Sequence, residues 1–184
     1  MSKTFFTADT HLGHQKAVNY IFNDHKLRPW DTVSEHDTAL ISNWNSVVAP
    51  DDTVYHLGDV LDPSAANMDI LLQLNGRKIL VKGNLDTLSD AEYLPYFAEV
   101  YPEHHIIEIN SKNFLLTHNY YDGDFIAKNK CYVNLHGHLH ADHVPDARYL
   151  CVSLEQNNFY PIELDSLLER IENNQLKYIK KLSF

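Results

Sequence analysis

The chain has 184 residues, of which 44% are hydrophobic and 22% charged, an ordinary soluble composition with enough chain for one domain and its core. Its formal net charge of −10 excludes a broad footprint on duplex nucleic acid, although acidic side chains that hold cations would reduce the working charge. No apolar run approaches the ~20 residues of a membrane span, and residues 1–14 lack the apolar core of a signal peptide, so we expect a cytoplasmic protein without a membrane partner.

The first half of the chain alternates predicted strands and helices. Hydrophobic patterning predicts strands at 3–9, 53–60 and 78–84, and helices at 15–22, at 34–48 and from 63 to about 73. Ser34 and Asp37 fit the capped start of the second helix, and Pro63 fits the start of the third. This alternation favours a parallel α/β arrangement.

The second half is dominated by predicted strands. After a broken helix at 90–100, strands are predicted at 104–109, 113–120, 131–138 and 149–154. An amphipathic helix follows at 164–174, with Asp165 as its N-cap, and the basic end at 177–184 is predicted to be a solvated strand. We expect these strands to pair antiparallel, and we expect one domain over 1–184. Cys131 and Cys151 form no paired metal motif and predict buried free thiols.

Five short polar segments each follow a predicted strand. They are "ADTHLGH", "LGDV", "KGNLD", "LTHNY" and "HGHLH", and they contribute Asp9, His11, Asp59, Asn84, His118, His138 and His140. Each segment alone is as well explained by a turn or a strand-end residue, but sites in α/β proteins form where strands end. Two pairs, Asp9 with His11 and His138 with His140, have the i, i+2 spacing that points both side chains to one side of an extended chain.

The donors in these segments are carboxylate or amide oxygens and imidazole nitrogens, the ligands that suit Mn, Fe or Zn. Gly58, Gly83 and Gly137 each directly precede one of them, at points where the backbone could bend tightly and approach closely. The joint pattern therefore predicts a site for divalent metal ions.

The ordered set Asp-x-His, Gly-Asp, Gly-Asn-x-Asp, His and Gly-His-x-His resembles the calcineurin-like metallophosphoesterase superfamily. "TADTHLGH", "RPW" and "NSVVAPDDTVYHLGDV" further resemble a small stand-alone branch of bacterial and phage phosphoesterases, which implies the cytoplasm of a bacterium or of a phage-infected host. The resemblance implies an α/β (mixed α+β) fold, a four-layer α/β/β/α sandwich of two mixed sheets flanked by helices.

The same resemblance implies two divalent metal ions, with Mn²⁺ favoured and Fe, Zn, Ni or Co as alternatives. Asp9, His11 and His140 would hold one ion, Asn84, His118 and His138 the other, and Asp59 would bridge them. A hydroxide between the ions would attack phosphorus in line. The implied activity is that of a phosphoesterase, with a phosphodiesterase favoured and a small nucleotide-like or cyclic phosphate ester as substrate. The alternatives are a metal-dependent nuclease and a catalytically dead binding scaffold, and the oligomeric state stays open.

One position departs from the resemblance. Many family members have a histidine after Gly-Asn that can protonate the leaving group or stabilise the transition state, whereas this chain has Leu85. Either the leaving group needs no acid, or His14 is the general acid; the alternative for His14 is a helix-start histidine or a contact to a ligand side chain. Asp86 is predicted to orient His118 or another ligand imidazole, with a plain turn aspartate as the alternative.

Three further side chains lie outside the predicted set of metal ligands. Arg28 is predicted to bind a substrate phosphate oxygen, with a surface salt bridge as the alternative. His136 and His143 have no counterpart in the family pattern, so we interpret them as a strand or ligand-contacting histidine and a loop histidine.

Overall fold

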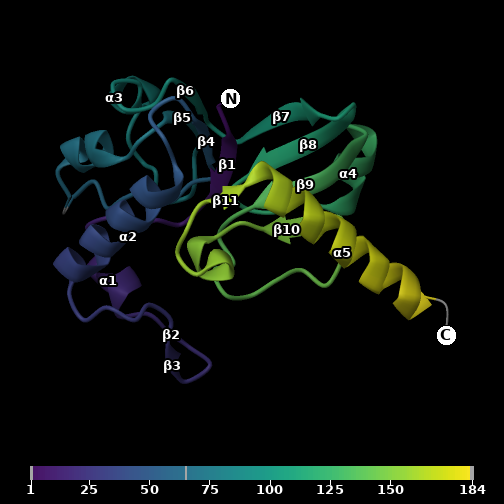
Figure 1. The fold of residues 1–184 in the computed structure, drawn as a ribbon, viewed down its shortest axis with the longest axis horizontal. Helices are drawn as coiled ribbons and strands as arrows, with labels where there is room; N and C mark the ends of the chain where they lie inside the picture. The colour runs from purple at the N-terminus through teal and green to yellow at the C-terminus, as the bar shows by residue number, and fades with distance from the viewer. Residues whose placement is uncertain (1, 65, 183–184) are drawn as a thin grey trace.

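Two β-sheets lie at the centre of the computed structural model, which describes residues 2–64 and 66–182, and helices flank them (Figure 1). The first sheet has the strand order β11-β1-β4-β5-β6. Its strands are β1 (Thr4–Thr7), β4 (Thr53–His56), β5 (Arg77–Val81), β6 (Glu99–Tyr101) and β11 (Ile162–Glu163). Strands β1, β4, β5 and β6 are parallel to one another, which confirms the parallel arrangement predicted for the first half. Strand β11 is antiparallel to β1.

The second sheet has the order β10-β9-β8-β7. Its strands are β7 (His104–Ile109), β8 (Lys112–Thr117), β9 (Cys131–His136) and β10 (Tyr149–Cys151). Only β7 and β8 pair antiparallel, whereas β8–β9 and β9–β10 are parallel, so the antiparallel prediction is wrong for those two pairs. Parallel neighbours need a crossover connection, and helix α4 (Gly123–Lys128) and the loop 137–148 provide the two crossovers. Two mixed sheets flanked by helices confirm the predicted fold class.

Several predicted helix boundaries are corrected. The first helix, α1, covers only Gln15–Val18, and the hairpin of β2 (Ile21–Phe22) and β3 (His25–Lys26) follows it. Helix α2 runs over Val33–Val47 and its N-cap is Thr32, not Ser34. The helix predicted from Pro63 begins only at Met68, as the 3-10 helix η1 (Met68–Gln73), and α3 is limited to Asp90–Tyr93.

The C-terminal helix α5 (Leu164–Leu182) is longer than predicted. Residues 164–182 contain no proline or glycine that would end the helix. Because 177–182 are helical, the strand predicted there is wrong, and 183–184 lie outside the described residues. Asp165 lies inside the first turn of α5 and is not its N-cap. In the described parts of the chain, no helix has both the length and the apolar surface to span a bilayer.

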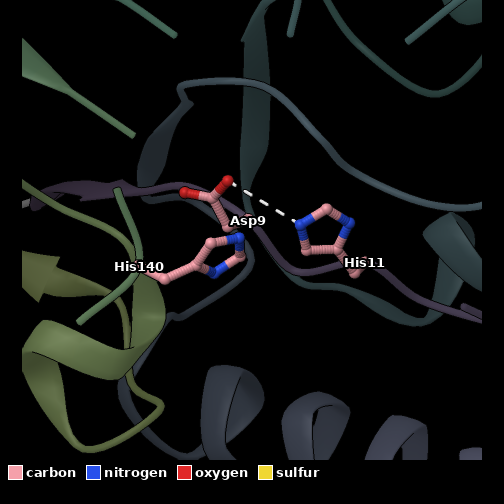
Figure 2. Close-up of side chains that lie close together, drawn as sticks. All are labelled: Asp9, His11 and His140. Carbon is pink, nitrogen blue, oxygen red and sulfur yellow. Dashed lines mark ion pairs between the residues drawn. The ribbon is translucent and has the colours of Figure 1, made fainter. Parts of the chain in front are cut away.

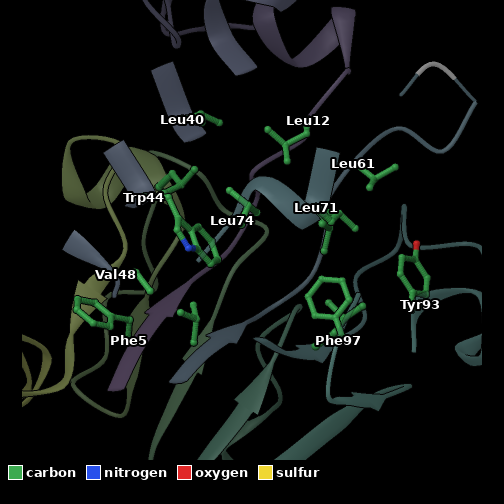
Figure 3. Close-up of a cluster of buried hydrophobic side chains, with 14 residues drawn as sticks. Phe5, Leu12, Leu40, Trp44, Val48, Leu61, Leu71, Leu74, Tyr93 and Phe97 are labelled. Carbon is green, nitrogen blue, oxygen red and sulfur yellow. The ribbon is translucent and has the colours of Figure 1, made fainter. Parts of the chain in front are cut away.

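The first sheet is buried on both faces. Phe5 points into a core shared with α2, together with Trp44, Leu40 and Leu80, part of which Figure 3 shows. The next residue, Phe6, points to the opposite face and packs in the core between the sheets, because side chains alternate along a strand. Leu167 and Ile171 of α5 close that second core, while Ile126 of α4 packs on the outer face of the second sheet. These layers fix the relative position of the strand ends that carry the polar segments.

Candidate metal centre

All five polar segments meet at one edge of the paired sheets. Asp9, Asp59 and Asn84 follow β1, β4 and β5 of the first sheet, and His118 and the His138–His140 turn follow β8 and β9 of the second. Backbone hydrogen bonds join neighbouring loops, from Asp9 N to Gly58 O (3.0 Å) and from Gly137 N to His118 O (3.0 Å). The main-chain N–H of His138 donates to Asp9 Oδ2 (2.9 Å), which links the two sheets.

One group of donors consists of Asp9, His11 and His140, whose side chains come from two distant segments and face one another (Figure 2). His11 Nε2 lies 3.8 Å from Asp9 Oδ1, and the rings of His11 and His140 stack with centroids 5.3 Å apart. Asp9 Oδ1 and His11 Nε2 are buried and have no hydrogen-bond partner among the described residues. Buried polar atoms nearly always have a hydrogen-bond partner. Two such atoms that lack one and face each other are therefore suited to bind a cation between them.

A second group gathers around His118. Its Nε2 lies 3.0 Å from Asn84 Oδ1, 3.4 Å from Asp59 Oδ2 and 3.3 Å from His138 Nδ1. Asp59 Oδ2 also lies 3.9 Å from His11 Nε2, so the Asp59 carboxylate faces both groups. Asp59 Oδ1 accepts a hydrogen bond from the backbone N–H of Leu85 (2.9 Å), which fixes the carboxylate between them.

The backbone at five of these seven donors is left-handed and not extended. The φ angles are 60° at Asp9, 48° at His11, 55° at Asp59, 68° at His138 and 51° at His140. The predicted extended i, i+2 geometry is therefore wrong for both pairs. Each strand has ended, and the left-handed turns redirect the side chains over the sheet edge.

The glycines before the donors do allow a close approach of backbone segments. A Cβ at Gly83 would lie 2.2 Å from Asp59 Oδ1 and 2.5 Å from Asp59 N. A Cβ at Gly137 would lie 2.7 Å from Asp9 Oδ2. Any side chain at these positions would displace a carboxylate of the site.

Electrostatics in the site reflect buried charge. Burial raises the pKa of Asp9 to about 6 and, with the charge of Arg28, lowers that of His11 well below its usual range. Burial opposes the charged form of His118, but the hydrogen bond to Asp59 and the charges of Asp9 and Asp59 outweigh it and raise its pKa to about 9. Carboxylates and imidazoles that shift each other's pKa values in this way form a set of ligands that divalent cations favour.

Arg28 does not have the predicted surroundings. Its side chain is 1% exposed, so the surface salt bridge is wrong. The guanidinium donates to Glu155 Oε1, to the main-chain oxygens of Asp9 and Thr10, and pairs with His36 Nε2. These bonds use all five N–H groups, so no donor remains for a substrate phosphate.

Glu155 was not found from the sequence. It lies in the 3-10 helix η2 (Leu154–Asn157), 127 positions from Arg28, and no local pattern marks it. Against the penalty of burial, the charge of Arg28 lowers the pKa of Glu155 to about 2. Ser153 was also missed, and its Oγ donates to Asp9 Oδ2 (2.6 Å).

Asp86 contacts backbone and not an imidazole. Its oxygens accept from the N–H groups of Asp59 (2.7 Å), Val60 (3.0 Å) and Gly83 (2.8 Å). The role predicted for it toward His118 is therefore wrong, because His118 Nδ1 bonds to Leu57 O (2.8 Å). Asp86 instead ties the Asp59 loop to the Gly83 loop.

A pocket of about 350 Å³ opens beside the donors. Five of the seven donor side chains line it, and the other lining residues are His14, Lys16, Ala17, Tyr20, Leu27, Arg28 and Leu85. His14 Nδ1 lies 3.4 Å from His11 Nδ1, which places His14 at the mouth of the site.

The two remaining histidines of this region do not line the pocket. His136 is a buried strand residue whose Nδ1 pairs with Gly137 O (2.9 Å), and burial lowers its pKa to about 4. The side chain of His143 is 75% exposed in the loop after β9.

The chain is similar to several known proteins. The model of the calcineurin-like phosphoesterase superfamily domain matches residues 4–153. An uncharacterized protein of Methanocaldococcus jannaschii is 30% identical over 96% of this chain and 95% of its own length. The crystal structure of a protein of unknown function from Aquifex aeolicus superposes with a TM-score of 0.73, at 30% identity, over 92% of this chain and 99% of that one.

A phage relative covers less of the chain. The gene 66 protein of Mycobacterium phage L5 is 39% identical over 47% of this chain and 41% of its own length. The match of the family model over residues 4–153 places the chain in the calcineurin-like phosphoesterase superfamily, whose members hydrolyse phosphate esters with the help of metal ions.

Proposed function

We propose that the protein is a phosphodiesterase that uses two divalent metal ions, Mn²⁺ for preference, to hydrolyse a small nucleotide-like or cyclic phosphate ester. The observation that carries this proposal is the position of the Asp59 carboxylate, 3.9 Å from His11 Nε2 and 3.4 Å from His118 Nε2. A single carboxylate that faces two separate donor groups is suited to hold two cations at once.

We assign the seven ligands to the two ions by the groups around His11 and His118, although the Asp9 carboxylate also lies within ligand distance of Asp59 and His118. Asp9, His11 and His140 would hold one ion, Asn84, His118 and His138 the other, and Asp59 both. When bound, such ions polarise a phosphate and activate a water molecule for attack. The orphaned atoms of Asp9 and His11 fit this assignment, since a cation would satisfy both.

His14 is suited to supply a proton to the leaving group. If His11 offers Nε2 to an ion, its Nδ1 carries the proton and donates to His14 Nδ1, 3.4 Å away. His14 then carries its own proton on Nε2. To act as a general acid, His14 must first take up a second proton on Nδ1, which breaks this contact with His11, and the Nε2 proton can then pass to the leaving oxygen and leave a neutral imidazole.

The pocket supports a small substrate. Its volume of about 350 Å³ is at the low end of the range for small-molecule sites and holds one nucleotide-sized group. Leu27, Leu85 and the Tyr20 ring offer apolar contacts, and Lys16 offers a cation for a phosphate. The net charge of −10 disfavours long nucleic acid.

The test measures bound metal and turnover together. Purified protein loaded with Mn²⁺ should bind two ions and hydrolyse bis-para-nitrophenyl phosphate faster than the monoester para-nitrophenyl phosphate. Chelation of the ions should abolish turnover. Asp59→Asn should lower kcat by about 10²-fold or more while leaving the circular dichroism spectrum unchanged, because the anion between the ions is lost.

Other outcomes select the alternatives. Faster turnover of the monoester would contradict the diesterase. Cleavage of DNA with steeply salt-dependent binding would indicate a nuclease. Two bound ions without hydrolysis of any ester would indicate a scaffold, and failure to bind ions in excess Mn²⁺ would refute the metal centre itself.

A further inference from the structure

A buried ion pair lies directly behind the donor group of Asp9, His11 and His140. Arg28 Nη2 and Nε donate to Glu155 Oε1 at 2.8 Å and 3.0 Å, and the two side chains are 1% and 3% exposed. A buried pair of this kind contributes little net stability, since the cost of removing both charges from water offsets their attraction. A role in stability alone therefore does not explain it.

Each member of the pair also contacts the donor group. Glu155 Oε1 lies 3.0 Å from His140 Nδ1. Because a carboxylate only accepts, Nδ1 of His140 carries the proton, and the lone pair is on Nε2. Arg28 meanwhile donates to the main-chain oxygens of Asp9 (2.5 Å) and Thr10 (3.0 Å), which fixes the left-handed turn that aims Asp9 and His11.

The contacts continue into helix α2. Arg28 Nη1 lies 2.7 Å from His36 Nε2, and His36 Nδ1 lies 2.7 Å from Asp37 Oδ1. The Asp37 carboxylate accepts from the backbone N–H of Gly13 at 3.0 Å and 3.1 Å. The segment from Asp9 to Gly13 is thus held at both ends by one connected set of side chains.

Among the described residues, no carboxylate outside the ligand set contacts His118 or His138 as Glu155 contacts His140. Around Asn84, His118 and His138, the hydrogen bond that orients an imidazole is the one that His118 Nδ1 donates to a main-chain oxygen, Leu57 O (2.8 Å). The direct contacts of the Arg28–Glu155 pair are therefore confined to ligands on one side of the site, and an effect on the other side would have to pass through the Asp9 carboxylate, which accepts from His138 N (2.9 Å).

We infer that Arg28 and Glu155 are a positioning pair for only one of the two ions, the ion assigned to Asp9, His11 and His140, and that they act by fixing the tautomer of His140 and the turn at Asp9. The inference rests on the proposed two-ion function. It gives Arg28 a task behind the ligands in place of the phosphate contact predicted from the sequence.

Titration of the metal-free protein with Mn²⁺, followed by calorimetry, tests this directly. Glu155→Gln keeps the size of the side chain but removes its charge. We expect the affinity of one ion to fall about 10–100-fold, the usual effect of losing a partner of a metal-bound histidine, and the affinity of the other to stay unchanged. Asn84→Ala should produce the complementary result.

Two further variants separate positioning from folding. Glu155→Gln leaves Arg28 buried without its partner, which destabilises a fold, so the double variant Arg28→Met/Glu155→Leu removes both charges together. It should fold, by circular dichroism, and still lose affinity for one ion. Glu163→Gln breaks the exposed pair with Lys3 (2.8 Å) and should change neither ion.

The failures are distinguishable. A wild-type protein that binds fewer than two ions would overturn both the proposed function and this inference. A wild type that binds two ions, with a folded Glu155→Gln that binds both as tightly, would overturn only the positioning role. Equal weakening of both ions would also overturn it, because that result indicates a general loosening of the site.

Discussion

At the scale of single residues, the site depends on backbone conformations that most side chains avoid. Five of the seven assigned ligands have φ between 48° and 68°. Each such residue costs on the order of 1 kcal/mol, although Asp and His tolerate the left-handed region better than most residues. The Asp86 carboxylate, which accepts three backbone N–H bonds, and the Arg28 guanidinium, which donates to two main-chain oxygens, offset part of that cost.

His14 gives the residue-scale prediction. We expect His14→Ala to reduce kcat by about 10²-fold or more for diesters with an alkyl leaving group, since these need a proton from a general acid. With para-nitrophenol as the leaving group, kcat should change little. Steady-state kinetics on the two substrate classes measure the difference.

The exposed loop residue His143 offers the matched control, and His143→Ala should leave both substrates unaffected. An equal loss on good and poor leaving groups would show that His14 acts through the His11 ligand and not as the acid.

At the scale of elements, helix α2 couples its own start to the site. Thr32 and Glu35 form a reciprocal capping box, in which Glu35 N donates to Thr32 Oγ1 (3.1 Å) and Thr32 N donates to Glu35 Oε2 (3.1 Å). The sequence suggested Ser34 with Asp37 instead, because both pairs have the three-residue spacing of a capping box. Asp37 is left to bind Gly13 N, next to the ligand loop.

Thr32→Ala should lower the free energy of unfolding by about 1 kcal/mol, the usual effect of losing an N-cap. Ser34→Ala, two positions along, should change it by less than about 0.5 kcal/mol. Urea denaturation of both variants measures the two values. The reverse order would mean that the helix begins at Ser34 in solution.

At the scale of the whole molecule, local patterns predicted which strand ends carry the donors but not how distant segments meet. Asp9, Asp59 and His118 are each marked by the apolar strand before them. The contact of Arg28 with Glu155 joins positions 127 apart, and no local signal exists for it. The direction of β9 and β10 depends on crossovers through α4 and the loop 137–148, which a propensity-based prediction of strands does not contain.

The free energy of unfolding of the metal-free protein should depend on pH through His56, which is buried beside Trp44. Thr10 Oγ1 donates to Val60 O (2.6 Å), so His56 Nε2 must donate to Thr10 Oγ1 (2.9 Å), and Nδ1 has no partner in the described structure. Protonation would place an unpaired N–H in the core. Burial accordingly lowers the pKa of His56 from 6.5 to about 3.

A folded-state pKa below the unfolded value means that the stabilisation is complete above pH 6.5 and is lost as pH falls toward about 3. The loss is about 1.4 kcal/mol for each pH unit in that range. Burial raises the pKa of Asp9 to about 6, so protonation of Asp9 increases stability in part of the same pH range. The wild type must therefore be compared with His56→Gln, which keeps a donor for Thr10 and does not titrate. Urea denaturation with chelator between about pH 7 and about pH 4 should show the wild type losing stability more steeply than the variant, because only the wild type takes up a proton on unfolding at this position. Parallel profiles would show that His56 is already charged, or already hydrated, in the folded protein.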